Sequence, residues 1–175
     1  MSRYKLTKKK YFQDHEYELL TAKLATHKHF RNSTMIYLAL YTGARAQELL
    51  NIRKEDLDHH QQSVYIQGLK NSDDRDIPVP AWLFKRLVQA SKLTSDDRLF
   101  PISYPRLDQI WTSFRPVEKK FHALRHTFAV RLYQRTKDIK LVQRALGHRD
   151  FKNTDIYLNF TFSQAEMRRL LVEGA

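Results

Sequence analysis

The stretch His122-Ala-Leu-Arg-His-Thr-Phe-Ala129 carries two histidines and an arginine at the spacing of a helix. His122 and Arg125 are three positions apart, so on a helix they share a face. His126 points away from that face, which suits a packing or hydrogen-bonding role. The stretch therefore predicts a helix over about residues 122–136 that presents a cationic donor beside a histidine.

Residues of related chemistry lie on both sides of this helix. Leu146-Gly-His148 follows it, Tyr157 comes nine residues after His148, and Arg45 lies far upstream after a glycine. Arginine forks bind phosphate oxygens bidentately, and a phenol with a pKa near ~10 needs a base or nearby cations to act as a nucleophile. Each residue alone is more typical of a packing or surface position. Together they favour attack on a phosphodiester by an oxygen nucleophile.

Length and composition fit one α-rich globular domain. The chain has 175 residues, is 42% hydrophobic, and contains 4 glycines and 5 prolines, which favours helices over a turn-rich all-β fold. The absence of cysteine excludes a disulfide framework and a thiolate metal site. The longest apolar stretch, Met35 to Tyr41, is too short to cross a bilayer. We expect a cytoplasmic protein that does not enter membranes.

The charge balance points to a polyanionic partner. There are 31 Lys and Arg against 19 Asp and Glu, a formal net charge of +12. An excess of this size favours binding to DNA, RNA or an anionic membrane, although a basic protein without such a partner is the simpler alternative. Membrane binding is the weaker option, because no expected helix has a wholly basic face opposite a wide apolar one.

Periodicity predicts helices around one small hairpin, a mainly α fold with one small antiparallel β-sheet (α+β). Helices are expected over 14–28, from Asn32-Ser33 to Thr42-Gly43, over 45–52, 81–92, about 104–114, 138–146 and 163–172. Asp14 is expected to cap the first of them. Strands are expected at 64–66 and 76–79, joined by the polar run 70–75, with a third short strand around Asp56-Leu57.

Four segments resemble, in order along the chain, the motifs of the tyrosine recombinase (phage integrase) family. Thr42 to Leu57 looks like the first arginine box, Lys70 like the lysine between two strands, His122 to Ala129 like the second box, and Leu146 to His148 with Asn153 to Tyr157 like the third box and the nucleophile. The resemblance runs from about residue 14 to 160. It implies the catalytic-domain fold shared with type IB topoisomerases.

The resemblance also implies a reaction, site-specific DNA recombination by integration, excision or inversion. Tyr157 would attack a phosphodiester to give a 3′-phosphotyrosine and a free 5′-hydroxyl. Arg45, Arg125 and His148 would hold the non-bridging oxygens. Lys70 would protonate the leaving 5′-oxygen.

Two further residues receive supporting roles from the resemblance. His122 would assist proton transfer at the nucleophile, and Glu48, three residues after Arg45, would orient that arginine or His122. Glu48 and Lys70 are as readily an ordinary surface acid and a hairpin lysine. Because rejoining is the reverse attack, neither ATP nor a metal or other cofactor is expected. A topoisomerase-like nicking and closing activity and a non-catalytic DNA-binding module remain the alternatives.

The expected organisation is a single catalytic domain over residues 1–175. Residues 1–10 are expected to be a basic flexible arm and 160–175 an amphipathic tail, packed in cis or exchanged with a neighbouring protomer. From the length of the chain, we expect no N-terminal domain of the kind with which members of the family clamp the other face of DNA. It is expected to be a catalytic-domain fragment or a small single-domain member similar to fimbrial inversion recombinases, of bacterial, phage or mobile-element origin.

Double-stranded DNA is the expected partner. Self-association into a tetramer on DNA through the tail is expected, and accessory DNA-bending proteins are possible partners. A helix around Ser103 to Phe114, with Arg106, Gln109 and Arg115, is our expectation for one base-reading element.

Overall fold

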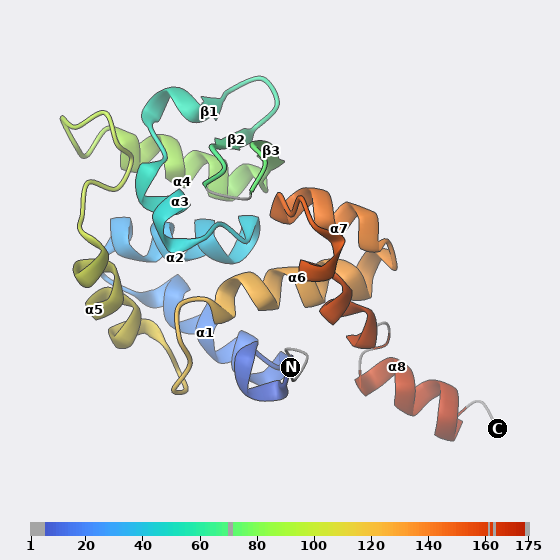
Figure 1. Cartoon of the computed structure of the whole chain (residues 1–175). Coiled ribbons are helices and arrows are strands. Elements are labelled where there is room, and N and C mark those ends of the chain that lie inside the picture. Colours follow the sequence, from blue (N-terminus) through green and yellow to red (C-terminus); the bar gives the residue numbers. More distant parts are fainter. Residues whose placement is uncertain (1–5, 70–71, 161, 163, 174–175) are drawn as a thin grey trace.

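The structure, a computed structural model, describes residues 6–69, 72–160, 162 and 164–173. It is mainly helical with one three-stranded antiparallel sheet, which confirms the expected fold class (Figure 1). The elements are η1 (Lys8–Lys10), α1 (Asp14–Thr26), α2 (Phe30–Thr42), α3 (Ala46–Asn51), η2 (Lys54–Asp56), β1 (Leu57–Asp58), β2 (Ser63–Ile66), β3 (Arg75–Pro78), α4 (Ala81–Ser91), α5 (Tyr104–Phe114), α6 (Ala123–Thr136), α7 (Ile139–Leu146), η3 (Phe151–Asn153), η4 (Asp155–Phe160), α8 (Gln164–Arg168) and the π-helical η5 (Arg169–Glu173).

Helix α2 is the central element of the core. Nine of its residues are buried, because its sequence is apolar on nearly every side, and it packs against α1, α3, α4 and α6. It ends at Gly43, whose φ of 64° lies in the left-handed region and whose N–H donates to the Ala39 carbonyl. A Cβ at Gly43 would lie 2.5 Å from Cδ1 of Phe128 on α6. The glycine therefore permits both the turn and the close approach of α6.

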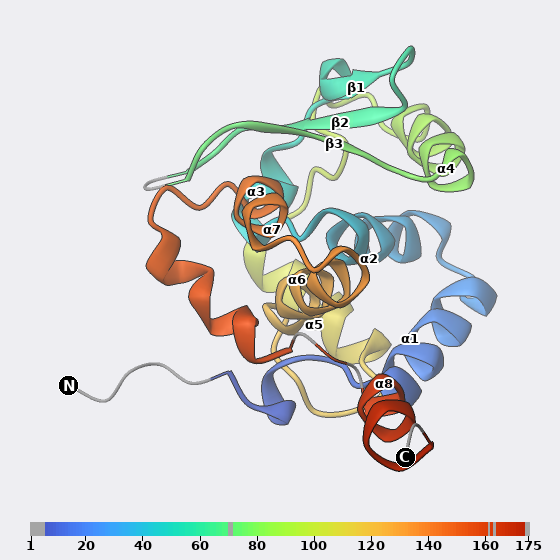
Figure 2. The same cartoon turned by 90° about the vertical axis from the view of Figure 1, so that its right-hand side faces the viewer.

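The small sheet has the order β1-β2-β3 and covers one end of the helical core (Figure 2). Val64 of β2 pairs with Leu57 on one side and Ile77 on the other, so the three side chains share the buried face. The hairpin arms that continue from β2 and β3 extend beyond the sheet toward the end of α7.

Helix α7 places a tight turn against this hairpin. The Asp138 carboxylate accepts bonds from the N–H groups of Lys140 and Leu141 at the start of the helix, and Gly147, with a φ of 66°, ends it. The Gly147 carbonyl accepts the N–H of Asp73 at 2.9 Å, and a Cβ on Gly147 would lie 2.6 Å from the Asp73 carbonyl oxygen. This close contact fixes the hairpin to the turn that precedes His148.

Several boundaries differ from expectation by a few residues. Asp14 does not cap α1. Gln13 precedes the helix and Asp14 is its first residue, because the Glu16 carboxylate accepts the Gln13 N–H at 2.9 Å. Helix α2 begins at Phe30, before the predicted Asn32-Ser33, since Ser33 and Thr34 bond back to the Phe30 carbonyl instead of capping.

Of the flexible arm expected over residues 1–10, residues 1–5 lie outside the described residues, and residues 6–10 pack on the domain. Leu6 is buried, and Lys8–Lys10 form a 3-10 turn. The turn is fastened by the buried ammonium of Lys119, which donates to the carbonyls of Lys8 and Tyr11. No local pattern reveals a partner more than 100 positions away.

The tail forms α8 and η5, which extend away from the rest of the molecule (Figure 1). Leu170, Leu171 and Val172 on this tail are 53%, 71% and 62% exposed. Within the part of the chain that the structure describes, no helix is both long and apolar enough to cross a bilayer.

Candidate active site

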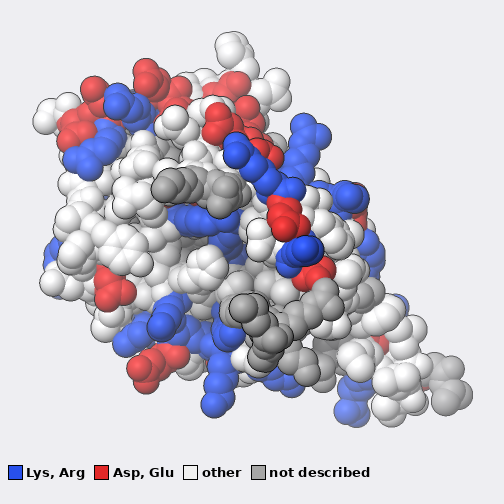
Figure 3. All heavy atoms as spheres, in the orientation of Figure 1, with Lys and Arg blue, Asp and Glu red and all other residues white. Residues whose placement is uncertain are grey.

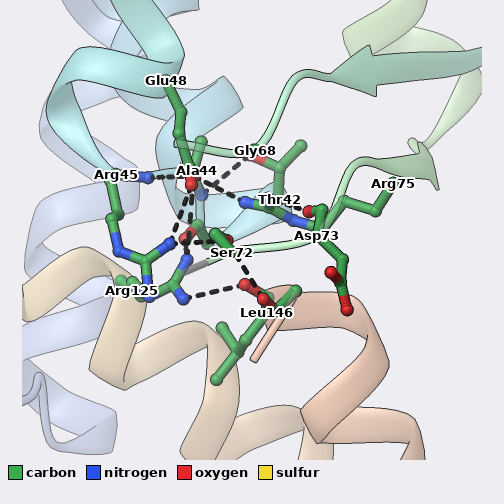
Figure 4. Close-up of polar contacts among 12 residues, drawn as sticks. Thr42, Ala44, Arg45, Glu48, Gly68, Ser72, Asp73, Arg75, Arg125 and Leu146 are labelled. Atoms are coloured by element: carbon green, nitrogen blue, oxygen red, sulfur yellow. Dashed lines mark hydrogen bonds and ion pairs between the residues drawn. The ribbon is translucent and has the colours of Figure 1, made fainter. Parts of the chain in front are cut away.

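The guanidinium of Arg125 lies buried between the C-terminal ends of two core helices. It donates from Nη1 to the Gly43 carbonyl at 2.7 Å and from Nη2 to the Leu146 carbonyl at 2.8 Å (Figure 4). Carbonyls at helix C-termini lack intrahelical donors and carry partial negative charge, which is why a buried cation is stable here. Burial and the charge of Arg45 lower the pKa of Arg125 to about 9, so it remains protonated at neutral pH.

Glu48, fully buried on α3, joins three arginines. Its Oε1 accepts from Arg45 Nη1 at 2.8 Å, and its Oε2 accepts from Arg75 Nη2 at 2.7 Å and lies 3.9 Å from Arg125 Nη1. Burial alone would raise the pKa of Glu48. The hydrogen bond and charge of Arg75, the backbone N–H of Arg45 and the charge of Arg125 outweigh burial and lower that pKa to about 2. Glu48 thus contacts Arg45 in the way the sequence suggested.

Arg75 is a member of this cluster that the sequence prediction did not include. It is buried on β3, where Arg75 and Ile77 occupy alternate inward positions. An arginine on the buried face of a strand requires an anionic partner, and that alternation was the signal that could have identified it. With Arg45 and Arg125 it makes three cations around the single carboxylate of Glu48, a net charge of +2 (3 − 1).

Arg45 is the arginine of the cluster that reaches solvent. It stands at the N-cap of α3 with 31% of its side chain exposed, against 2% for Arg125. Its Nη1 also donates to Ser72 Oγ at 2.8 Å, and that hydroxyl donates to the Gly147 carbonyl at 3.0 Å. Arg45 is therefore placed to meet a ligand that approaches from outside. Lys70, the predicted acid on the same hairpin, lies outside the described residues.

His148 is brought to the cluster as predicted. Its Nε2 lies 2.9 Å from Arg125 Nη2, and its Nδ1 lies 2.9 Å from Thr154 Oγ1. An arginine can only donate, so Nε2 accepts and the proton of the neutral ring is on Nδ1. Burial and the charges of Arg125 and Arg45 lower the pKa of His148 to about 3. Donation from Nε2 to a phosphate would require the other tautomer.

Tyr157 is buried on η4, and its hydroxyl lies 2.9 Å from Nδ1 of His126. Sequence reasoning assigned proton transfer at this tyrosine to His122, whereas the structure places His126 beside the hydroxyl. The His122 ring, which is partly open to solvent, lies edge-on to the His126 ring with centroids 4.7 Å apart. The hydrogen-bonding role expected for His126 is present, but its partner could not be read from the sequence.

Both of these histidines are held neutral at pH 7. Burial, followed by electrostatic interaction with His122 and Arg125, lowers the pKa of His126 to about 3. Partial desolvation and the charges of Arg125 and Arg45 lower the pKa of His122 to about 4. A neutral imidazole next to the phenol can accept a hydrogen bond, which an imidazolium cannot.

The predicted base-reading residues lie on α5, outside this cluster. Arg106 Nη1 donates to Gln109 Oε1 at 3.0 Å, and both side chains are exposed. Arg115 is half-buried at the C-terminal end of the helix. Their contact with bases stays a prediction.

On the face shown in Figure 3, Lys and Arg side chains lie in the centre and along the lower part, and most acidic side chains lie in the upper part with basic ones among them. Among the described residues, no group of three or more His, Asp or Glu is placed to hold a metal ion. Inside the molecule, the arginine cluster lies against His148, and the buried Tyr157 hydroxyl lies beside His126.

Comparison with known proteins agrees with this arrangement. The sequence model of the phage integrase family matches residues 10–164. The tyrosine recombinase XerA of Thermococcus onnurineus is 28% identical over 162 residues, covering 82% of this chain and 57% of the relative. A tyrosine recombinase of Pseudothermotoga lettingae is 31% identical over 161 residues, covering 84% and 56%. The chain spans about half the length of these relatives.

Solved structures show the same fold. The XerH site-specific recombinase in a post-cleavage complex with a palindromic difH substrate superposes with a TM-score of 0.74, 23% identity, and coverage of 97% of this chain and 54% of that one. The catalytic domain of bacteriophage HP1 integrase gives 0.69, 21% identity, and coverage of 93% and 94%. With the family match over most of its length and the two arginine boxes, the histidine turn and the tyrosine gathered on this fold, the chain belongs to the phage integrase family.

Proposed function

We propose that this chain cuts and rejoins double-stranded DNA at specific sites through a tyrosine ester, as in site-specific recombination. The observation that carries the proposal is the junction at α6, where Arg125 enters the cation cluster and the next residue, His126, lies 2.9 Å from the Tyr157 hydroxyl. Arg125 thus belongs to the cations that would bind phosphate, and the next residue, His126, would accept the proton of the nucleophile. Membership of the phage integrase family supports the same chemistry.

In the proposed reaction, a bond forms between the Tyr157 oxygen and the phosphorus, and the bond from phosphorus to the 5′-oxygen breaks. The products are a 3′-phosphotyrosine and a 5′-hydroxyl. The phenolic proton passes to the His126 and His122 pair, and the electron pair of the broken bond stays on the 5′-oxygen, which takes a proton from Lys70 in our prediction. One phosphoester replaces another, so the reverse attack rejoins the strand without an energy source.

The arginine cluster matches the charge that this reaction develops. A phosphodiester carries one negative charge and its pentacoordinate transition state carries two. The net +2 of Arg45, Arg75, Arg125 and Glu48 is assembled before DNA arrives, so little reorganisation is needed when that charge appears. Arg45 is the partly exposed member, and we propose that it makes the first contact with the phosphate.

Covalent capture tests this function. Nicked duplexes with randomised sequence around the nick are incubated with the chain, and adducts are collected on a denaturing gel. We expect an adduct that Tyr157→Phe abolishes and Arg45→Ala reduces severely, because the first lacks the nucleophile and the second loses the exposed phosphate donor. An adduct that persists in Tyr157→Phe would overturn the nucleophile assignment.

The same material separates the alternative activities. Recombinant products from two copies of the captured site support recombination, whereas relaxation of supercoiled DNA without such products indicates nicking and closing alone. Binding without any adduct would leave a non-catalytic DNA-binding module.

We further propose that the tail of one protomer covers a groove on the next when the chain assembles into a tetramer on DNA. The groove has a volume of about 1230 Å³ and is bordered by α1, α2, β3, α6 and α7, with apolar side chains that include Leu40, Phe128 and Leu141. Glu166, at the start of the tail, also lines it, while the apolar end of the tail projects into solvent. Charged side chains such as Arg131 and Arg144 also line the groove, and its apolar part is complementary to the exposed Leu170, Leu171 and Val172 of another copy.

Serine substitution tests this assembly. The triple variant of Leu170, Leu171 and Val172 to serine should keep its adduct activity on single duplexes but lose tetramers on the captured site, measured by analytical ultracentrifugation. A double variant with serine at Leu19 and Leu93, which are 56% and 55% exposed elsewhere, is the control. Unchanged tetramer formation in the tail variant would contradict the exchange.

A further inference from the structure

The segment before α1 touches both elements that define the position of the nucleophile. The ring of Tyr11 packs edge-on against Phe160 of η4, with centroids 5.1 Å apart. Phe160 follows Tyr157 by three residues, which is one turn of a 3-10 helix, so the two side chains lie on the same side of η4. The contact therefore acts on the face of η4 that carries the nucleophile.

The next residue of this segment is bonded to α6. The N–H of Phe12 donates to Thr127 Oγ1 at 2.8 Å, and that hydroxyl donates to the Ala123 carbonyl at 2.7 Å. Thr127 directly follows His126, whose ring meets the Tyr157 hydroxyl. Tyr11 and Phe12 thus link the helix that carries the nucleophile to the helix that carries its hydrogen-bond partner.

Lys119 fixes this segment in place. Its buried ammonium donates to the Tyr11 and Lys8 carbonyls and forms an ion pair with Glu16 of α1. These three partners use all three N–H donors of a lysine. The ammonium also lies 5.1 Å from the ring centroid of Phe12. Because these contacts hold the segment in place, Tyr11 can fix the position of Phe160, which packs on it.

We propose that Tyr11 is a positioning residue for the nucleophile, in that its ring, by packing on Phe160, sets the orientation in which η4 presents the Tyr157 hydroxyl to the scissile phosphate. This inference rests on the proposed function. Tyr11 lies outside the arginine cluster, so its loss should slow the attack of Tyr157 without weakening the binding of DNA.

The charge of the segment supports a link to this end of the site. The positive charge of Lys10, after burial and the charges of His122 and Arg125, is one of the causes that lower the pKa of His126. The segment is thus within electrostatic reach of the imidazole beside the nucleophile.

Single-turnover cleavage of saturating nicked duplex tests the role of Tyr11, with the dissociation constant for the same DNA measured in parallel. Tyr11→Ala and Phe160→Ala should each slow cleavage about three- to tenfold, the range expected for loss of one aromatic pair that orients the attacking group. Tyr11→Phe keeps the ring and should cleave at the wild-type rate. The double alanine variant should be no slower than the slower single variant, since both remove the same contact.

Circular dichroism at the assay temperature shows whether each variant is folded, and Leu93→Ala serves as a surface truncation control. Wild-type cleavage by folded Tyr11→Ala, multiplicative effects in the double variant, or a loss confined to DNA affinity would each overturn the role of Tyr11. Thr127→Val tests the second link independently if Tyr11→Ala does not fold, and it too should slow cleavage at unchanged affinity. If the wild-type chain forms no adduct, the proposed function itself is wrong. If the wild-type chain forms the adduct and the Tyr11 variants cleave normally, only the positioning role is wrong.

Discussion

The arginine cluster and the nucleophile are held by different means. Arg125 is bonded to backbone carbonyls at the ends of α2 and α7, and Glu48 holds the remaining guanidiniums from inside the core. Tyr157 lies on a 3-10 helix, a form with poorer hydrogen-bond geometry, and its hydroxyl meets a side chain, His126. The arginine cluster, our proposed phosphate-binding half of the site, is thus bonded into the fold, whereas the hydroxyl of Tyr157, our proposed nucleophile, meets a side chain.

The largest of the effects predicted below is a loss of cleavage rate when Arg125, the arginine bonded to backbone carbonyls, is replaced. Arg125→Lys should lower the single-turnover cleavage rate by about 10²- to 10³-fold, because one ammonium cannot reach both helix ends, His148 and a phosphate. Arg131→Lys on the same helix, where the side chain is 43% exposed, is the matched control and should stay within about twofold of wild type. Equal losses in the two variants would contradict the special role of Arg125.

Glu48→Gln should give the largest loss of stability. Removing the carboxylate leaves Arg75 buried and unpaired, which should lower the free energy of unfolding by about 3 kcal/mol. Urea unfolding at pH 7 measures it, with Glu55→Gln on the exposed surface as the control. A loss below about 1 kcal/mol would contradict the claim that the pairing of Glu48 with Arg75 stabilises the folded protein.

Low pH should weaken the protein through two histidines whose pKa values fall on folding. The pKa values of His126 and His148 fall from 6.5 to about 3 on folding, so between these values the unfolded chain binds more protons. The free energy of unfolding is therefore highest, as far as these histidines affect it, above pH 6.5. It decreases as the pH falls toward 3, by up to about 1.4 kcal/mol per pH unit for each histidine. Glu48, with a pKa of about 2, stays charged over most of this range.

Urea unfolding at pH 7.5, 6 and 5 measures this slope. In His126→Gln the slope should fall by about one proton, or about 1.4 kcal/mol per pH unit. An unchanged slope in this variant would show that His126 does not titrate on unfolding as described.

The smallest effect should be the loss of stability in Tyr157→Phe. Removing the hydroxyl, which lies within hydrogen-bond distance of His126 Nδ1, should lower the free energy of unfolding by about 1 kcal/mol, measured by urea unfolding as for Glu48→Gln. This variant keeps the ring that fills the core and removes the contact of the hydroxyl with His126. A loss as large as that of Glu48→Gln would erase the distinction between the two halves.

Residues that share an element were the ones that sequence could bring together. The spacing of Arg45 and Glu48 predicted their contact, because residues three apart on a helix start are neighbours. The glycines that end α2 and α7 marked the two turns that meet Arg125, although nothing local showed that they meet. Mainly helical architecture followed from composition and periodicity alone.

Contacts across elements were not predictable in the same way. The pairing of His126 with Tyr157 joins α6 to η4, and that of Arg75 with Glu48 joins β3 to α3. No alternation or spacing encodes which helix a given ring will face, since that depends on how whole elements pack. The hydrogen bonds from Lys119 to the segment before α1 could not be predicted for the same reason.

The way α3 begins makes Arg45 unusually suitable for separating assembly from chemistry. The capping bond at this helix start is donated by the backbone N–H of Arg45 to the Glu48 carboxylate at 2.9 Å, so it does not need the guanidinium. Replacing the side chain should leave the helix start intact while removing the exposed phosphate donor. An Arg45→Ala chain would then serve as a folded, slowly cutting reagent for structural work on its DNA complexes.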